Sequence, residues 1–346
     1  MSSEYKKSIQ TYYDECNRDY EIVWQLRDSL ALHYGYWDET TLTHRQALWN
    51  ANYQIARHAQ INSSDYVLDA GCGVGGTCFF LANTIGCKVH GISLTPTQVD
   101  QAVSTKAEFD EKNLTGFSCQ DYCKTNFPDN TFDAILAIES AMYAMPKNSF
   151  LEECFRILKP GGRLVVADYF LRKTQHEREQ KTLNKWAKSW VIKEFILEYD
   201  YLEDLEKLGY LNYSLMDISN QVLPSIKLMH RSYYPGILIS RVSNFFGRRT
   251  DYQVENSKSG RYQFQSFRQG VWRYKYLKAF KPPINADTKT DEDRNHKLDI
   301  KQYIDDESFA ARFPILSKNG LSLRNLIKRI MHFYLESRIR DNRLWF

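Results

Sequence analysis

The sequence of 346 residues lacks several features that would reveal its class at once. Its longest apolar runs, LVVADYFL and FDAILAI, are far shorter than the roughly 18 residues that a membrane-spanning helix needs. The opening MSSEYKKSIQTYYDE turns polar without a basic-then-apolar leader, which predicts a cytoplasmic protein. No internal repeat of roughly 20–50 residues is visible, which argues against solenoids and propellers.

Charge and cysteine usage are equally unspecialised. The 46 basic and 42 acidic residues leave a net charge of +4, too balanced to indicate nucleic acid as a primary partner. The seven cysteines form no CxxC pair and lie near no histidine cluster. Reduced thiols are therefore expected rather than a disulfide framework or a zinc site, and no metal is predicted.

Aromatic residues, in contrast, are abundant. Phe, Trp and Tyr make up 14% of the chain, with 23 tyrosines among them, beside an ordinary 43% of hydrophobic residues. That share exceeds what packing needs and suggests a cavity that holds an apolar or cationic ligand.

Short apolar runs alternate with helical patterns from residue 65 onward. We predict strands over 66–71, 87–93, 116–121, 132–140 and 163–170, with helices over 77–86, 96–113 and 148–162. Such alternation indicates a parallel sheet that is covered on both faces. Two further strands are predicted in NYSLMDIS and over 272–280.

The remaining segments define the domain organisation. Residues 1–60 read as an N-terminal helical cap, and 61–280 as the main domain, with helical insertions near 174–208 and 224–246. Residues 281–297 are rich in Pro, Asp and Lys, as in a linker, and 298–346 form a C-terminal extension. Its basic amphipathic helix near 321–340 is expected to dock on the core or to form a homodimer contact, with peripheral membrane contact as the alternative.

A glycine-rich loop, YVLDAGCGVGGT, lies directly after a predicted strand and before a helix. Such a loop lets a nucleotide-like ligand approach the backbone beside a helix N-terminus. A dinucleotide site would need an acidic residue about 20 positions further on, where this sequence has HGIS. NAD is therefore disfavoured as the ligand. A purely structural tight turn, which binds no ligand, is the alternative to a nucleotide site.

Several blocks in order resemble the class I S-adenosylmethionine (SAM)-dependent methyltransferases. VLDAGCGVGG is similar to their motif I, which implies that Asp69 lies near the methionine part of SAM and that Gly71 and Gly73 face it. SCQDYC implies that Asp121 binds the adenine amino group, with Tyr122 beside it. The resemblance implies a Rossmann-like, seven-stranded, mostly parallel sheet with helices on both faces. GISLTPTQ is similar to the cyclopropane-synthase branch, which implies that Ser93 and Gln98 hold the ribose.

The N-terminal block YYDECNRDYEIVW…LHYGYWDE resembles the helical cap of sterol and tocopherol methyltransferases. This likeness implies a cap that closes over cofactor and acceptor, with Tyr12, Tyr20 and Tyr34 as cofactor-side residues. Aromatic faces stabilise a cation such as a sulfonium by about 0.5–2 kcal/mol per contact. Packing on the core is the alternative role for this aromatic stripe, to which the cap also contributes Tyr13, His33, Tyr36 and Trp37.

The segment IESAMYAM resembles the acceptor loop of enzymes that methylate carbon, including those that act on prenyl diphosphates. The likeness implies that Glu139 takes part in catalysis or positions the cofactor, and Tyr143 is a candidate to assist by hydrogen bonding. His230 is a secondary candidate base, and His90 is expected to be a satisfied core histidine. Arg248 and Arg249 are either diphosphate ligands or a solvated pair.

The sequence therefore predicts a SAM-dependent methyltransferase of a lipophilic small molecule, with carbon as the expected acceptor atom. The acceptor is a sterol, a prenyl diphosphate or another isoprenoid. O- or N-methylation of a quinol, phenol or amine is the first alternative. A non-catalytic SAM-binding module and a nicotinamide oxidoreductase are alternatives from other classes.

Overall fold

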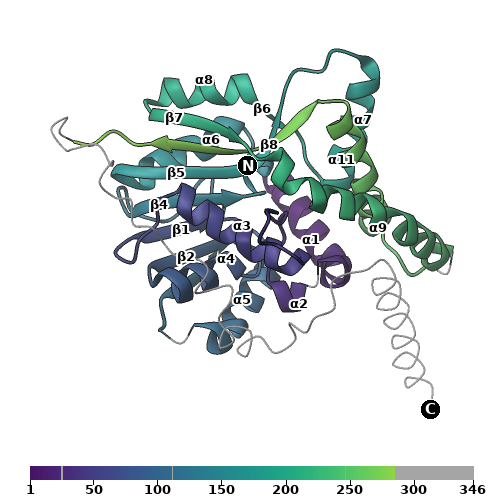
Figure 1. Ribbon diagram of the computed structural model, residues 1–346, viewed down its shortest axis with the longest axis horizontal. Helices are drawn as coiled ribbons and strands as arrows, with labels where there is room; N and C mark the ends of the chain where they lie inside the picture. Colours follow the sequence, from purple (N-terminus) through teal and green to yellow (C-terminus); the bar gives the residue numbers. More distant parts are fainter. Residues whose placement is uncertain (25, 111, 246, 285–346) are drawn as a thin grey trace.

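The computed structural model describes residues 1–24, 26–110, 112–245 and 247–284. In this part of the chain one sheet has the strand order β3-β2-β1-β4-β5-β8-β7, and the short β6 pairs with β5 off that path (Figure 1). The predicted α/β class with a mostly parallel sheet is confirmed. The linker predicted over 281–297 reaches beyond the described residues, and the extension predicted over 298–346 lies outside them altogether.

The strands lie close to their predicted positions. Parallel pairing joins β1 (Tyr66–Ala70) to β2 (Lys88–Ser93) and β4 (Phe132–Ile138), β2 to β3 (Thr115–Cys119), and β4 to β5 (Leu158–Leu171). Only β8 (Trp272–Phe280) runs antiparallel within the described sheet, between β5 and β7 (Leu211–Asp217). The strand β6 (Ile196–Leu197) was not predicted, because two residues are too few to produce a pattern.

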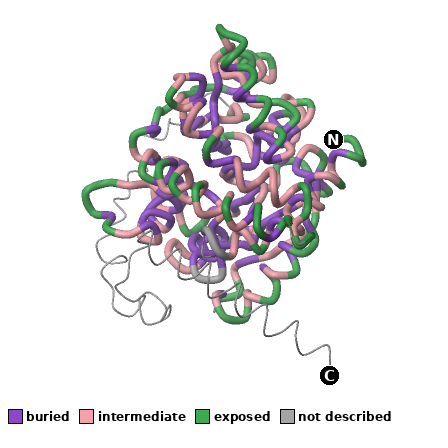
Figure 2. The backbone as a smooth tube through the Cα atoms, turned by 90° about the vertical axis from the view of Figure 1, so that its right-hand side faces the viewer, coloured by how far each residue is buried: buried purple, intermediate pink, exposed green. Residues whose placement is uncertain are grey.

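Buried side chains pack on both faces of the sheet. Neighbouring residues of β1 show this, since Val67 belongs to one buried cluster and Leu68 to another. Figure 2 shows the buried stretches gathered in the interior, with exposed stretches mainly at the loops. One cluster includes α3 (His44–His58) and the π-helix η1 (Leu81–Ile85); the other includes α6 (Lys147–Ile157) and α8 (Glu198–Leu208).

Several helix boundaries differ from the prediction. The helix α4 (Gly76–Phe80) continues as η1, α5 (Pro96–Phe109) ends early, and α6 ends at Ile157 because β5 begins with the next residue. The segment predicted as helical over 174–208 is interrupted by β6, between α7 (Glu177–Trp190) and α8. The later insertion is longer than predicted: α9 (Ser219–Phe245) is followed by α10 (Asp251–Asn256) and α11 (Ser259–Arg268).

The N-terminal helices pack beside the ends of the strands. The helices α1 (Ser3–Val23) and α2 (Leu26–Ser29) precede α3, whose N-cap Thr43 forms a capping box with Gln46. The side-chain amide of Gln10 on α1 donates to the Leu94 carbonyl directly after β2, at 2.8 Å. None of the described helices combines the length and the apolar character that crossing a bilayer requires.

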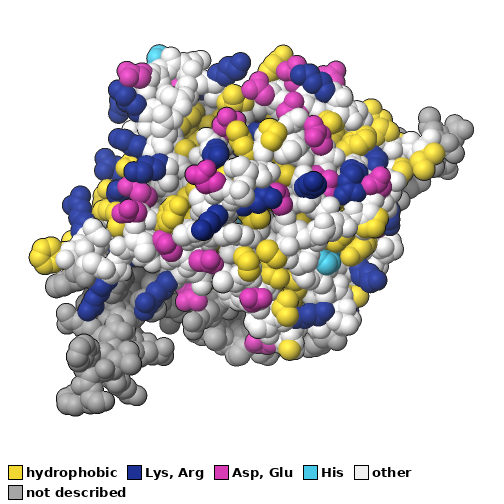
Figure 3. Space-filling model, turned by 180° about the vertical axis from the view of Figure 1, so that it is seen from behind, with side chains coloured by type: hydrophobic (Ala, Val, Ile, Leu, Met, Phe, Trp, Pro, Cys, Tyr) yellow, Lys and Arg dark blue, Asp and Glu magenta, His cyan; other side chains and the backbone are white. Residues whose placement is uncertain are grey.

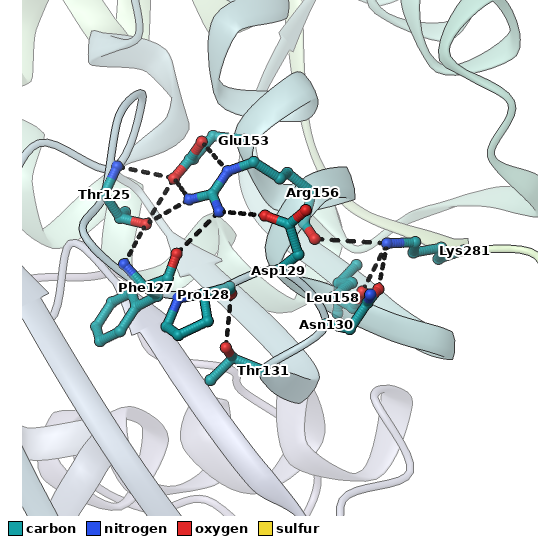
Figure 4. A network of polar contacts seen from close by, with 10 residues as sticks. All are labelled: Thr125, Phe127, Pro128, Asp129, Asn130, Thr131, Glu153, Arg156, Leu158 and Lys281. Atoms are coloured by element: carbon teal, nitrogen blue, oxygen red, sulfur yellow. Dashed lines mark hydrogen bonds and ion pairs between the residues drawn. The ribbon is translucent and has the colours of Figure 1, made fainter.

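An arginine on α6 anchors the loop between β3 and β4 (Figure 4). Arg156 donates to both carboxylate oxygens of Glu153, at 3.0 and 2.6 Å, and to Asp129 at 2.6 Å and the Phe127 carbonyl at 2.9 Å. Glu153 in turn accepts from the backbone and hydroxyl of Thr125. These contacts join the loop to α6, so they support the residues with which that loop begins.

We expect Arg156→Met to lower the free energy of unfolding by about 1–2 kcal/mol, because a half-exposed bidentate pair and its backbone contact are lost together. Chemical denaturation measures this change. Lys207→Met is the matched control, since it removes a surface pair with Glu203 on α8 that is exposed on both sides. Equal effects of the two variants would contradict the anchoring role.

Candidate functional site

A cavity lies at the carboxyl ends of the parallel strands. Open α/β sheets bind their ligands at this edge. The walls come from the turn after β1, the ends of β2, β3 and β4, helix α1 and the segment after α2. Of the residues predicted for the site, the cavity is lined by Asp69, Gly71, Gly73, Ser93, Gln98, Asp121, Tyr122, Glu139 and Tyr143.

The turn after β1 requires glycine at two positions. Gly71 has a φ of +99°, and a Cβ there would lie 2.4 Å from the Cβ of Ser140, in the loop after β4. A Cβ on Gly76, at the start of α4, would lie 2.1 Å from the Leu30 carbonyl oxygen of the cap. The glycine turn thus packs tightly against Ser140 and Leu30, which leave no room for side chains at these two positions. Its backbone lines the cavity at Gly71 and Gly73.

Asp69 is the residue before the last of β1, directly ahead of this turn. Its carboxylate is buried and accepts a weak hydrogen bond from the Cys78 thiol at 3.4 Å. Burial raises the pKa of Asp69 to about 7. A charged group that faces the cavity would therefore readily change the protonation state of Asp69.

Two neutral side chains at the end of β2 hold one another in place. The Ser93 hydroxyl donates to Gln98 Oε1 at 2.8 Å and accepts from the Thr95 backbone N–H at 3.2 Å. Both side chains are buried and line the cavity. They offer neutral donors and acceptors in a fixed arrangement, as hydroxyl recognition needs.

Asp121 after β3 is already engaged by the cap. One carboxylate oxygen accepts from the Cys123 N–H at 2.9 Å, and the other lies 2.7 Å from Lys6 Nζ on α1 and 3.6 Å from the Met1 amine. Tyr122 beside it donates its hydroxyl to the Ser140 carbonyl at 2.7 Å. A ligand amino group that binds this second oxygen of Asp121 would compete for it with Lys6 of α1.

Glu139 is the most heavily hydrogen-bonded carboxylate of the cavity. It follows β4 with a φ of +49° and is buried. Oε1 accepts from the Tyr34 backbone N–H at 2.6 Å and from the Tyr274 hydroxyl at 2.9 Å, and Oε2 accepts from the Tyr169 hydroxyl at 2.5 Å. Burial raises its pKa to about 7 against the opposite effect of these donors, with a further small increase from Asp168.

Aromatic rings surround this carboxylate. The rings of Tyr34, Tyr169 and Tyr274 contact one another with centroids 5.5–5.8 Å apart, and Tyr169 also contacts Trp186 and Trp272 at 5.1 Å. Most of these pairs are edge-to-face, an arrangement that aromatic rings prefer. Glu139 therefore lies at the junction of the cap, β5 and β8.

Four tyrosines form a second group, which we call the tyrosine wall: Tyr12, Tyr13, Tyr20 and Tyr143. Tyr13 and Tyr143 line the cavity, and their hydroxyls lie 3.3 Å apart. Tyr12 is buried behind them, with its hydroxyl 2.6 Å from that of Tyr20 and 3.0 Å from Asn256. Tyr12 and Tyr20 thus pack behind Tyr13 and Tyr143 and do not line this cavity. Tyr34 contributes its backbone N–H, which donates to Glu139.

His230 is not brought to the cavity. It lies on α9 and stacks on Phe264 at 4.3 Å, beside an open hollow that is also lined by Arg178 and Arg261. Arg249 is not solvated, because it is largely buried against Asp19, at 2.5 Å, whereas Arg248 is exposed.

The other histidines and the remaining cap residues have separate roles. His90 is hydrogen-bonded to Ser118 at 2.8 Å, and His33 lines the cavity. Tyr36 borders a separate small hollow, and Trp37 donates to Ser225 at 2.9 Å.

Two residues of the site were missed by sequence reasoning, Tyr169 and Tyr274. They are direct partners in the antiparallel pairing of β5 with β8, more than 100 positions apart in sequence. The signal available was the alternation of tyrosines in WRYKYLKAF, which does not show which strand β8 pairs with. All seven cysteines are free thiols, and nowhere in the described ranges do three metal-ligating side chains gather.

A comparison with known families finds a match for the part of the chain that forms most of the parallel sheet. Residues 68–166, from β1 to β5, match the family model described as a methyltransferase domain. A probable tocopherol O-methyltransferase of Oryza sativa is 25% identical over 63% of this chain and 64% of its own length. A 2-methyl-6-phytyl-1,4-hydroquinone methyltransferase of Synechocystis is 35% identical over 41% and 45%, and a sterol 24-C-methyltransferase of Eremothecium gossypii is 28% identical over 51% and 46%. The chain thus spans about half to two thirds of the length of these relatives.

Solved structures share the fold over most of this chain. A geranyl diphosphate C-methyltransferase from Streptomyces coelicolor, solved with Mg²⁺, geranyl diphosphate and S-adenosyl-L-homocysteine, has a TM-score of 0.64 at 17% identity and covers 81% of this chain and 98% of its own. The [4+2]-cyclase SpnF has a TM-score of 0.61 at 23% identity, with 77% and 94% covered. Residues 68–166 therefore match a methyltransferase domain, and most of the chain shares the fold of these solved structures.

Proposed function

We propose that this protein transfers the methyl group of SAM to a lipophilic small molecule, at a carbon atom of a sterol, a prenyl diphosphate or another isoprenoid. One observation carries the proposal. A single cavity joins the glycine turn and the polar groups beside it to Glu139 and to Tyr13 and Tyr143 of the tyrosine wall. The relatives named for sterol, tocopherol and phytyl-hydroquinone methylation support an acceptor of this kind.

The residues at this end of the cavity fit the proposed cofactor. Gly71 and Gly73 leave backbone exposed to the cavity, the Ser93–Gln98 pair suits ribose hydroxyls, and Asp121 suits the adenine amino group. Bound SAM supplies a methyl group on a positively charged sulfur, which is already activated for transfer. The contribution of the protein is to orient the two reactants and to exclude water.

The acceptor end suits a reaction that creates positive charge. Methylation of an alkene carbon leaves a carbocation on the acceptor, and the faces of Tyr13 and Tyr143 stabilise such a cation at short range. A proton must then leave a neighbouring carbon. Glu139 takes that proton as general base, and the electrons of the broken C–H bond restore the double bond.

The hydrogen bonds of Glu139 are compatible with this role. A carboxylate has about four acceptor positions, and three of them are used by Tyr34, Tyr169 and Tyr274. Oε2 carries only the bond from Tyr169, so it retains a free acceptor position. A pKa of about 7 is close to the optimum for a base that works near neutral pH.

O-methylation of a quinol or phenol is a second candidate. The same carboxylate would remove the proton of a phenolic hydroxyl, and one of the relatives is named a tocopherol O-methyltransferase. His230 has no part in either proposal, because it lies beside a different hollow.

The function is tested by incubating the protein with SAM labelled on its methyl group and fractionated lipids from its host, followed by identification of the labelled product. We expect a labelled isoprenoid lipid with a new carbon–methyl bond. A methyl ether or a methylated amine would replace the first candidate by the second. SAM binding without any labelled product would favour the non-catalytic module, and NAD binding by calorimetry would favour the oxidoreductase.

Asp121→Ala is expected to weaken SAM binding about 10- to 100-fold, because a charged hydrogen-bond acceptor is lost. Isothermal titration calorimetry measures the affinity. Asp200→Ala on the exposed side of α8 is the control. Lys6→Met should leave SAM affinity equal or higher, since it removes the competing cation. Unchanged affinity of Asp121→Ala would remove Asp121 from the cofactor site.

Glu139→Gln is expected to lower turnover about 100-fold or more while changing SAM affinity less than about threefold. In the unsubstituted protein, turnover should fall as the pH drops below about 7, because the base must be ionised and its pKa is raised to about 7. This decline should be absent from the residual activity of Glu139→Gln. The pH profile of kcat measures both effects, with Glu203→Gln on α8 as control.

Tyr169→Phe gives an independent test of the same base. It removes a donor that stabilises the ionised carboxylate, so the midpoint of the pH profile should move to higher pH. A fall in turnover without a shifted midpoint would mean that Tyr169 acts only through packing.

A further inference from the structure

The outer face of α9 exposes large apolar side chains in a row. Tyr234, Leu238, Val242 and Phe245 are 61%, 64%, 54% and 85% exposed. Their spacing of four, four and three residues places them on one side of the helix. Of the eleven large hydrophobic side chains exposed in the described part of the chain, four lie in this one row, which we call the α9 ridge.

Positive charge accompanies the α9 ridge. Lys227, Arg231 and Arg241 are exposed, and their spacing to Tyr234 and Leu238 places them on the same side of the helix. Residues 219–250 contain no Asp or Glu at all. Within the described ranges, neither Arg231 nor Arg241 forms an ion pair, so their charges are not neutralised by the protein.

The position of α9 makes the ridge accessible. The helix lies at one edge of the molecule and its end projects from the body (Figure 1). Along the corresponding left-hand edge of Figure 3, hydrophobic side chains and Lys or Arg side chains lie next to one another. Contiguous apolar surface bordered by cations on a projecting helix is typical of a segment that lies in a membrane interface.

We infer that the α9 ridge docks on the surface of an anionic lipid bilayer. The four apolar side chains enter the boundary between headgroups and acyl chains, and Lys227, Arg231 and Arg241 contact the anionic headgroups. This docking does not depend on the proposed methyltransferase activity.

Charge disfavours two other partners that could cover the ridge, a second copy of the chain and its own C-terminal segment. A second copy with twofold symmetry would bring the same acid-free segment against itself, and its cations would repel one another. The C-terminal segment 321–340 carries five Lys or Arg residues against one Glu, so it too would meet the ridge with charge of the same sign. An anionic bilayer supplies the opposite charge.

The inner face of the same helix borders a second cavity. Tyr233, Gly236 and Ile239 of α9 line it, opposite Trp24 and Trp190.

Tyr20 lines this second cavity, and its ring stacks on Tyr13 of the first cavity with centroids 6.1 Å apart. If the proposed function holds, a lipophilic acceptor that leaves the bilayer beside α9 enters a cavity that is lined by Tyr20 of the tyrosine wall.

Cosedimentation of the full chain with sucrose-loaded vesicles tests the docking. We expect binding to vesicles of phosphatidylcholine with 30% phosphatidylglycerol that weakens steeply with added salt, and little binding to phosphatidylcholine alone. Leu238→Ser with Phe245→Ser should lower the partition coefficient about 100-fold. Leu42→Ser with Tyr199→Ser, at apolar residues 82% and 72% exposed elsewhere, is the matched control and should bind unchanged.

A second variant protects the test against misfolding of the first. Arg231→Gln with Arg241→Gln keeps the apolar side chains and should lower binding about 30-fold, at roughly one kcal/mol for each charge. Lys207→Gln is its control. Circular dichroism and SAM affinity report folding, independently of turnover.

Three results would overturn the inference. The first is no binding of the unsubstituted chain to anionic vesicles, as expected if another part of the chain covers the ridge. The second is binding that both ridge variants retain, which would place the contact elsewhere. The third is a dimer by analytical ultracentrifugation that Leu238→Ser with Phe245→Ser converts to a monomer.

Discussion

A buried carboxylate with three hydrogen-bond donors is the constraint around which this structure is organised. Glu139 takes one donor from the cap, one from β5 and one from β8, so three parts of the chain must come together before the carboxylate is satisfied. Leaving such a group buried without partners costs several kcal/mol. The same contacts that pay for its burial also fix the aromatic surroundings of the cavity.

The three hydrogen bonds and the burial have opposite effects on the proton affinity of Glu139. Burial raises the pKa of the carboxyl, and the hydrogen bonds from Tyr169, Tyr34 and Tyr274 lower it, with a net pKa of about 7. Asp69 and Asp168 also have pKa values raised to about 7 by burial. If a cationic reactant occupies the cavity, as proposed, its charge favours the ionised forms of Asp69 and Glu139, which line that cavity.

The residues that could be predicted from the sequence are those in local motifs. Asp69 and Ser93 lie in the last two residues of their strands, and Gly71 and Asp121 follow a strand within two residues. Parallel strands bring their carboxyl ends to one edge of the sheet. A pattern within a short window is enough to identify them. The same reasoning identified Glu139 after β4, although not the donors that hold it.

Residues that depend on long-range packing could not be predicted. Tyr169 meets Tyr274 only because β8 pairs antiparallel with β5 in one register, and a shift by one residue would turn the tyrosines to the opposite face. His230 lies in an aromatic helical segment, as do some residues that line the cavity, yet the direction of α9 places it against Phe264. Roles of this kind follow from which elements pack together rather than from local spacing.

The ion pair between Lys6 and Asp121 links the first helix to the floor of the cavity. If the adenine of the cofactor takes the same oxygen, the nucleoside and α1 exclude one another at that atom. Exchange of spent cofactor would then be tied to a displacement of the N-terminal helix, and the order in which reactants enter would follow from that coupling. Helix α1 and the nucleoside would then leave and return to Asp121 in alternation.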